Sequence, residues 1–376
     1  PICRSRRVKR PYTTAGIRLH GKLYYDEADM RTCFCNDTNA YKTTTPEETR
    51  CVLWRSWGNA MTQGTTLWWL LLAGNNTFHD EKLISDIAEM SRLEQKIVTH
   101  DRRPVAEIAV FCDEESMCFV NSRQRVFHAF NREARERLAH IGAPMDFYLL
   151  SDIGNVNMPD YKIYVFLNAY YMTPEKRASI HKKLAKNNAI AVWCHAPGYL
   201  SPQGNLHSTM KELTGFRFGD ISKVSRTPLV FTSAGKELLP DMAKENREEY
   251  TMSPLFFVKP DAEDTVLANI GKAPVLVKRQ EVFGTSLFSA VPPTAALLRD
   301  LCRANGIHIY IGSNDVLRAN AGVVMVHASS AGVKRINIPW QTPVREVVSG
   351  RIFNNAGKIE LPMKFGQTAI FIPASR

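Results

Sequence analysis

Three carboxylates lie close together near the start of the chain. Asp26, Glu27 and Asp29 end a β-rich run that starts at Leu19, which favours a β-strand at this point. Because side chains alternate along a strand, Glu27 shares a face with Tyr25, while Asp26 faces the other side. A carboxylate where a parallel strand ends is typical of the reactive edge of α/β barrels. Glu27 is therefore our candidate catalytic nucleophile.

Two tryptophans lie in a second predicted strand, over residues 65–73. Trp68 and Trp69 are neighbours, so at most one faces a site and the other packs outward. A sugar ring stacks its C–H face on indole, and cleavage of a glycosidic bond needs carboxyl groups. Carboxylate and tryptophan at neighbouring strand ends therefore indicate a carbohydrate site, with His20 and Asp26 as further candidate contacts.

Each of these residues also has a purely structural interpretation. Glu27 could only form an ion pair with Arg31 or Lys22, and a tryptophan or histidine is as often a packing residue. A retaining glycosidase needs a second carboxyl group about 5 Å from the nucleophile. Asp26 and Asp29 are too near Glu27 in sequence to supply it across a sugar. The acid/base group must come from another strand, and the rest of the chain offers no comparable site.

Other residues suggest different chemistry more weakly. Cys194 precedes His195 at the end of a predicted strand, which hints at a nucleophilic thiol. The glycine-flanked turn of a nucleophile elbow is absent, so a buried, inert thiol is favoured. The acidic residues 113–115 lack further ligands at metal spacing, and Cys33 and Cys35 have the wrong spacing for a zinc site. We expect neither a metal nor an organic cofactor.

Composition narrows the class of protein. A chain of 376 residues with 44% hydrophobic and 23% charged residues is an ordinary globular protein of more than one domain. No run approaches the ~20 apolar residues of a membrane span, so we expect no membrane partner. The net charge of +11 includes a basic cluster at the N-terminus: Arg4, Arg6, Arg7, Lys9 and Arg10. Without a zinc-finger or RNA-binding signature we interpret this cluster as solvated and expect no nucleic-acid partner. The sequence leaves the cellular compartment open.

The first hundred residues predict the order strand, helix, strand, helix. The first helix has a clear start at Thr45-Pro46 and a stop at Gly64, and the second covers residues 80–98. The first strand belongs to a β-rich run starting at Leu19. Two such units cannot bury a sheet alone. Together with proline at position 1, this predicts a fragment whose other barrel strands precede it.

A polar linker at residues 100–104 precedes a new α/β pattern. Its alternating strands and helices predict a doubly wound sheet. From about residue 320 short strands separated by glycine and proline predict a small β-sandwich. The ranges expected before it are strands 105–111, 145–150, 161–167, 189–193, 229–231, 255–258, 275–278, 285–290 and 307–311, and helices 124–141, 173–187 and 294–305, with 236–246 helical or mobile.

These stretches together resemble the C-terminal half of the β-galactosidase-type glycoside hydrolases of family 42. Residues 20–32 are similar to the seventh barrel strand, where the clan keeps its glutamate nucleophile. Residues 64–69 are similar to the eighth strand, whose tryptophan lines the sugar subsite. Residues 107–215 resemble the family's middle domain, and the tail is similar to its small β-domain. The sequence departs from many relatives at residues 70–72, where leucines replace an expected polar residue.

The resemblance implies a fold class and a domain order. Residues 1–103 would be the end of a (β/α)8 barrel, and residues 104–315 a flavodoxin-like domain of the class I glutamine-amidotransferase type, which mediates trimerisation in relatives. Residues 316–376 would be the β-sandwich.

The resemblance also implies retaining cleavage of terminal β-galactosides. Glu27 would be the nucleophile, with the acid/base glutamate upstream of residue 1. The chain alone would then be inactive, and the parent protein a homo-oligomer, a trimer by resemblance. The alternative is a non-catalytic assembly or binding protein built on the amidotransferase-like domain.

Overall fold

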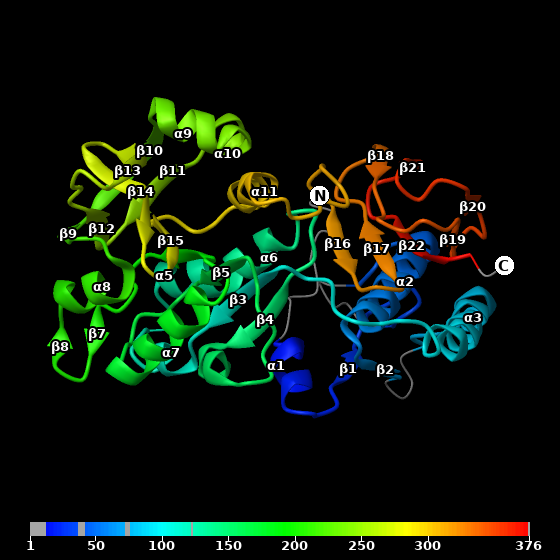
Figure 1. The fold of residues 1–376 in the computed structure, drawn as a ribbon. Helices are drawn as coiled ribbons and strands as arrows, with labels where there is room; N and C mark the ends of the chain where they lie inside the picture. The colour runs from blue at the N-terminus through cyan, green and yellow to red at the C-terminus, as the bar shows by residue number, and fades with distance from the viewer. Residues whose placement is uncertain (1–12, 37–41, 72–75, 122, 375–376) are drawn as a thin grey trace.

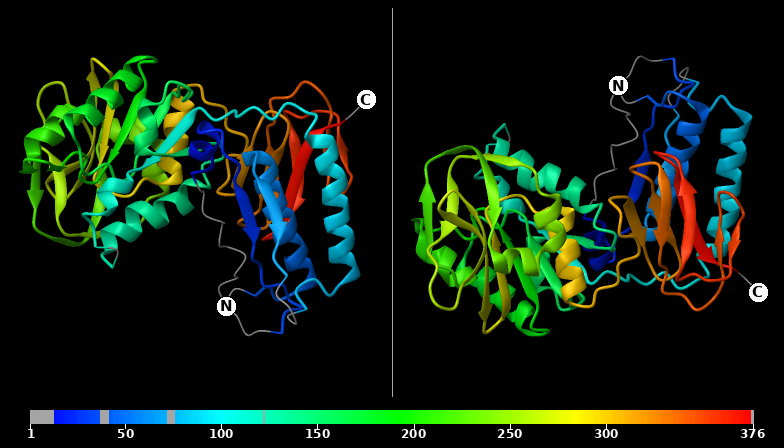
Figure 2. Two further views of the ribbon diagram at one scale, coloured as in Figure 1. Left: turned by 90° about the horizontal axis from the view of Figure 1, so that it is seen from below. Right: turned by 90° about the horizontal axis from the view of Figure 1, so that it is seen from above.

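The computed structural model describes residues 13–36, 42–71, 76–121 and 123–374. The chain forms two lobes (Figure 1). The larger lobe is built on the middle of the chain, and the smaller one combines segments from both ends. Views from below and above show the same separation (Figure 2). The basic cluster at residues 4–10 lies outside the described residues.

Among the described residues the larger lobe has a mixed nine-stranded sheet. Its parallel part has the spatial order β4-β3-β5-β6-β15, and antiparallel strands extend it in the order β14, β13, β10 and β11. The bounds are β3 Ile108–Cys112, β4 Asp146–Leu149, β5 Ile163–Phe166, β6 Ile190–Cys194, β10 Val224–Phe231, β11 Glu249–Met252, β13 Thr265–Ile270, β14 Ala273–Glu281 and β15 Gly284–Ser289.

The three central parallel strands, β3, β5 and β6, are apolar along their whole length, which suits strands covered on both faces. Every residue of β3, β5 and β6 is buried. The remaining elements of this lobe are α4 Glu114–Met117, α5 Arg125–Phe127, the π-helical turn η2 His128–Glu133, α6 Ala134–Leu138, η3 Leu150–Gly154, α7 Pro174–Ala185, α8 His207–Thr214, α9 Ser233–Leu238, α10 Pro240–Glu245, α11 Ala295–Ala304, and the short strands β7 Leu200–Ser201, β8 Gly204–Asn205, β9 Phe218–Ile221 and β12 Leu255–Val258. The helix predicted over 124–141 is present as the run from α5 to α6.

The smaller lobe joins the N-terminal and C-terminal parts of the chain. Helices α2 (Pro46–Gln63) and α3 (Glu81–Ile97) accompany the parallel strands β1 (Tyr25–Ala28) and β2 (Thr66–Trp69). In the described residues the C-terminal strands form a five-stranded sheet, β16-β17-β22-β19-β20, and the pair β18–β21. Their bounds are β16 Val316–Ala319, β17 Val324–His327, β18 Gly332–Ile336, β19 Val344–Glu346, β20 Ile352–Phe353, β21 Ile359–Met363 and β22 Thr368–Pro373.

One apolar core connects these two parts of the smaller lobe. Leu53 and Trp57 of α2 belong to the same buried cluster as Met325 and Ile370 of the C-terminal sheet. The predicted division at 103/104 and 315/316 stays a prediction, and the packing shows that its first and third parts share a core.

Local sequence explains the bounds of α2. The Thr45 hydroxyl accepts a hydrogen bond from the Glu48 N–H at 3.1 Å, and Pro46 occupies the first turn. Gly64 ends the helix in the left-handed region at φ 65°, where glycine is favoured. The predicted helix is therefore confirmed, together with the residues that start and stop it.

The predicted start of one strand is wrong, and a second predicted strand is nearly absent. The β-rich run from Leu19 does not begin a strand, because a helix α1 covers Thr14–Leu19 and β1 starts only at Tyr25. Ala15 of α1 is buried in the core of the larger lobe, so tertiary packing decides the local structure here. The strand expected at 307–311 is reduced to a single bridge of Ile311, since the Tyr310 N–H is bonded to the Gly142 carbonyl instead.

Within the described part of the chain, no helix is both long enough and apolar enough to cross a membrane.

Gly58 tests the contact between α2 and the C-terminal sheet. A Cβ at this position would lie 2.8 Å from Met325 Sδ and 2.9 Å from Ile370 Cδ1. We expect Gly58→Val to lower the free energy of unfolding of the smaller lobe by about 1–3 kcal/mol, because the core must shift to admit it. Urea unfolding followed by tryptophan fluorescence measures this. Asn59→Val, one residue further along α2, is the control, and an equal loss there would contradict the packing explanation.

Candidate active site

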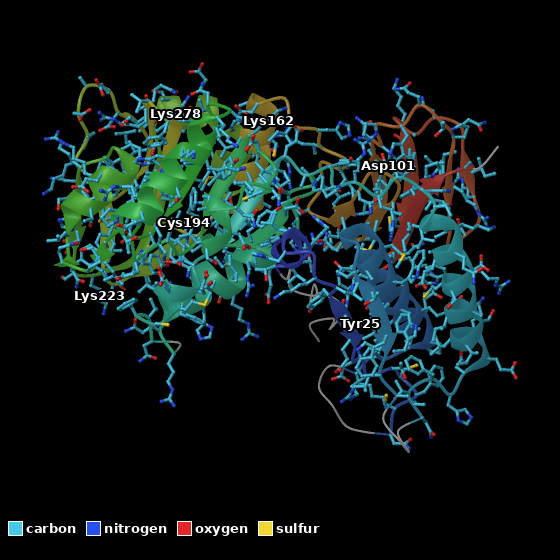
Figure 3. All side chains as sticks on the ribbon, turned by 60° about the horizontal axis from the view of Figure 1, so that its bottom comes forward. Tyr25, Asp101, Lys162, Cys194, Lys223 and Lys278 are labelled. Carbon is cyan, nitrogen blue, oxygen red and sulfur yellow. The ribbon has the colours of Figure 1, made fainter. Side chains whose placement is uncertain are left out.

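Strands β1 and β2 lie side by side, with Glu27 opposite Trp68 and Tyr25 opposite Thr66. Because both strands are parallel and in register, Tyr25, Glu27 and Trp68 share one face of the pair. Tyr25 is 64% exposed, Glu27 is exposed, and Trp68 is 42% exposed. The structure therefore brings the predicted nucleophile and one predicted tryptophan together on an accessible face. In Figure 3 the label of Tyr25 marks the start of β1.

The other face of the pair is covered by helices. Ala28 belongs to the buried core that α2 and α3 supply, and Asp26 is only 3% exposed. Asp26 therefore lies across the strand from Glu27. This geometry does not allow Asp26 to contact a sugar bound on the Glu27 face, contrary to the expectation from the sequence.

The two tryptophans have different environments. Trp69 packs against the core of the smaller lobe and meets Phe78 edge-on, with ring centroids 6.3 Å apart and an interplanar angle of 77°. Only Trp68 presents its indole on the Glu27 face. Because side chains alternate along the strand, only one of the two tryptophans can face the candidate site, and the structure shows that it is Trp68.

His20 does not join the strand pair. It follows α1, and its Nε2 lies 2.7 Å from Asp152 Oδ1 of the larger lobe. Arg18, on the same helix, lies 3.6 Å from Asp146, a carboxyl group whose pKa is raised by burial. Sequence reasoning missed this contact because nothing local indicates which lobe α1 packs against.

The loops after β1 and β2 are tied to each other. The Thr32 hydroxyl, after β1, donates to the Thr77 carbonyl, after β2. Within the loop after β1, the Thr43 N–H donates to the Arg31 carbonyl at 2.8 Å. Arg31 also pairs with Asp29. These contacts fix the chain directly after Glu27, at the carboxyl end of the strands.

Comparison with known proteins gives a match in structure alone. No protein-family model matches the sequence, and no curated protein sequence matches it. The β-galactosidase from Bacillus circulans sp. alkalophilus aligns over 96% of this chain and 57% of its own, with a TM-score of 0.67 and 14% identity. Gan42B, a GH42 β-galactosidase from G. stearothermophilus, aligns over 90% and 53%, with a TM-score of 0.61 and 13% identity.

The expected resemblance to family 42 β-galactosidases is confirmed in the fold. The chain spans just over half the length of these enzymes, which is consistent with a C-terminal part. The α-L-fucosidase isoenzyme 2 from Paenibacillus thiaminolyticus is also similar, over 96% of this chain and 62% of its own, with a TM-score of 0.56 and 12% identity. The shared fold is therefore glycosidase-like, and it occurs in enzymes named for different sugars.

This β-galactosidase-like fold contains a second cluster of polar side chains, at the carboxyl ends of β3 and β5. Asp113 is buried and accepts from Lys176 Nζ at 3.1 Å, and it also pairs with Ser116. Asn168 accepts from the Asp113 N–H at 2.8 Å. Burial raises the pKa of the Asp113 carboxyl, which Ser116 and Lys176 partly offset. The network satisfies its own members and fixes the loops.

The pair Cys194–His195 is sealed inside the same lobe. Burial raises the pKa of the Cys194 thiol far above its ordinary value. His195 adopts a left-handed φ of 63° and its ring is enclosed by Phe130, Tyr170 and Phe256. Burial lowers the pKa of this imidazole to about 4. A thiol and a histidine that are both inaccessible and neutral support the inert interpretation of Cys194.

The thiols offer a direct test. Cys194 should resist alkylation by iodoacetamide at pH 8, because it is buried and its thiolate is suppressed, whereas the exposed Cys118 should react. Mass spectrometry of the labelled, folded protein reads both sites. Labelling of Cys194 at a rate comparable to Cys118 would show that the site is accessible.

His195 should make the larger lobe acid-sensitive. An unfolded histidine titrates near 6.5 and this one near 4, so below pH 6.5 the unfolded state binds a proton that the folded state does not. The free energy of unfolding should therefore fall as the pH drops from 6.5 towards 4, by roughly 2–3 kcal/mol from this group. His195→Asn, which tolerates the left-handed backbone, should flatten that dependence in urea unfolding. An unchanged pH slope would contradict it.

Proposed function

We propose that this chain carries the nucleophile of a retaining glycosidase of the β-galactosidase type, and that the nucleophile is Glu27. The observation that carries the proposal is the placement of Glu27 opposite Trp68 on the accessible face of β1–β2. A carboxylate at the carboxyl edge of parallel strands can serve as the nucleophile of a sugar-cleaving site, and an exposed indole beside it can stack on the sugar. The similarity in fold to β-galactosidases supports it.

The chemistry follows from these two groups. The sugar would stack its C–H face on Trp68, while a Glu27 carboxylate oxygen attacks the anomeric carbon as the bond to the leaving oxygen breaks. A second carboxyl group protonates that oxygen, and then deprotonates the water that releases the sugar with retained configuration. Asp26 lies on the opposite face and Asp29 pairs with Arg31, so neither is placed for this role. We assign it to a part of the enzyme outside this chain.

The same proposal assigns roles to the lobes. β1-α2-β2-α3 would be the last two units of a (β/α)8 barrel, with the open face of β1–β2 turned to the barrel interior. The larger lobe would be an amidotransferase-like domain that supports a homo-oligomer, a trimer by resemblance, and the C-terminal strands a β-sandwich. The substrate would be a terminal β-galactoside.

A non-catalytic assembly or binding protein is the second candidate. The larger lobe favours it, because Cys194 and His195 are buried and the Asp113 network is satisfied internally. This candidate requires no role for Glu27.

Replacement of Glu27 distinguishes the two candidates. In a protein that completes the barrel, Glu27→Gly should reduce hydrolysis of an aryl β-galactoside on the order of 10³-fold or more. Azide should restore turnover, because it fills the space of the lost carboxylate and attacks the anomeric carbon directly. The product should be the α-galactosyl azide, since a single displacement inverts the configuration. Nuclear magnetic resonance of the product reads this.

Asp29→Gly is the matched control, because it removes a neighbouring carboxylate that pairs with Arg31. It should keep far more activity than Glu27→Gly and form no azide product, because Glu27 remains in place. Full activity of Glu27→Gly would remove the nucleophile assignment and favour the non-catalytic candidate.

A further inference from the structure

The larger lobe has a groove of about 370 Å³ beside β11. One wall is the helical run from α5 to α6, and the other is the strand β11 with its flanking residues. The lining residues are Gln124, Arg125, Val126, Ala129, Phe130, Glu133 and Arg137 on the helical wall, and Glu248, Glu249, Tyr250, Thr251, Met252 and Ser253 on the strand wall, with Pro292.

The strand wall shows how the groove is oriented. Side chains alternate between the two faces of a strand, so a pocket over one face would be lined by every second residue. Here six consecutive residues, Glu248 to Ser253, line it. The groove therefore runs along the edge of β11 rather than over a face of the sheet.

That edge is open. β11 is the last strand of the large sheet and pairs only with β10 among the described residues. An edge strand presents a row of backbone N–H and C=O groups to any extended chain that lies beside it. Proteins commonly protect such edges with lysine or proline within the strand, and Glu249–Met252 contains neither.

The helical wall restricts what can occupy the groove. Val126, Ala129 and Phe130 stand beside the strand edge, so the edge is recessed. The edge strand of a second copy would bring the helices that cover its own sheet against this helical wall. A single extended segment carries no such helices and therefore fits beside the edge. At one end the Arg137–Glu248 ion pair, at 3.0 Å, crosses from helix to strand and limits its length.

The side chains define the chemistry of the segment. Tyr250 and Met252 are buried in the core while Glu249 and Thr251 are exposed, so an added strand would continue an apolar inner face and a polar outer face. Three carboxylates line the groove. Glu248 pairs with Arg137 and Glu249 with Arg226, whereas Glu133 forms no ion pair with a described residue. Apolar residues that alternate with basic ones, one of them placed against Glu133, complement this arrangement.

We propose that this groove binds an extended peptide segment with alternating apolar and basic residues, which adds to β11 as a further strand. The apolar side chains pack on Val126 and Ala129, a basic one faces Glu133, and backbone hydrogen bonds to β11 hold the register. This function is separate from the proposed chemistry at Glu27 and does not depend on it.

A labelled heptapeptide of alternating valine and lysine, with valine at both ends, tests the proposal by fluorescence anisotropy with the full chain. The heptapeptide with glutamate in place of lysine should bind at least tenfold more weakly. Because successive N–H groups of a strand point to opposite edges, only one set contacts β11. Methylation of the amide nitrogens of either the valines or the lysines should abolish binding in one case and leave it largely intact in the other. Equal effects of the two methylated peptides would overturn strand addition.

Glu133→Lys and Glu136→Lys form a matched pair on the same helical run. Glu133 lines the groove and Glu136 does not. Binding of the valine–lysine peptide should weaken at least fivefold for Glu133→Lys and less than twofold for Glu136→Lys, with circular dichroism unchanged in both. Equal weakening of binding by the two variants would show that only the overall charge of the protein matters, and would overturn the proposed binding site. Self-association of the chain in sedimentation that Glu133→Lys abolishes, without peptide binding, would assign the groove to a second copy instead.

Discussion

The packing of α2 against the C-terminal sheet is the interaction on which the candidate site depends. Trp57 of α2 is fully buried and shares a core with Met325 and Ile370. The Thr368 hydroxyl donates to the Cys51 carbonyl at 2.7 Å, so the sheet also holds the helix backbone. Arg55 lies in this contact beside His327, and burial lowers the pKa of its guanidinium to about 10. A β1–β2 pair alone would be too small to hold its shape, and α2 supplies the missing layer.

This support determines which side chains are available for chemistry. Once α2 and α3 cover one face of β1–β2, Asp26, Ala28 and Trp69 must pack there, and Glu27 and Trp68 must lie on the other face. The loop contacts of Thr32 then hold the strand ends in place. The position of the carboxylate thus follows from burial of its neighbours along the strand.

Local sequence patterns were enough to predict which face of β1 carries Glu27 and where α2 begins and ends. Alternation separated Glu27 from Asp26, and Thr45, Pro46 and Gly64 marked the ends of α2. Such signals depend on a few neighbouring residues, so a single sequence is enough to recognise them. The cap at Thr45 needs no distant partner, which is why its prediction did not depend on the rest of the fold.

Contacts between segments that are distant in the sequence could not be predicted from such local patterns. Leu19 suits a strand as well as a helix end, and only the burial of Ala15 in the larger lobe decides between them. Nothing near His20 indicates that Asp152, which lies 132 residues further along, would bind its ring. The groove beside β11 could not be predicted from the sequence either, because it forms only when the helical run and the edge strand come together in the fold.

The contact at His20 also links the two lobes physically. α1 is held on the larger lobe by Asp146 and Asp152, and the chain reaches Tyr25 only five residues after His20. Arg18 and Thr14 of α1 additionally bond to Gln63 at the end of α2. A short connection pinned at both ends restricts how far β1 can move relative to the larger lobe. The larger lobe therefore does more than sit beside the smaller one: it anchors the start of the strand that presents Glu27.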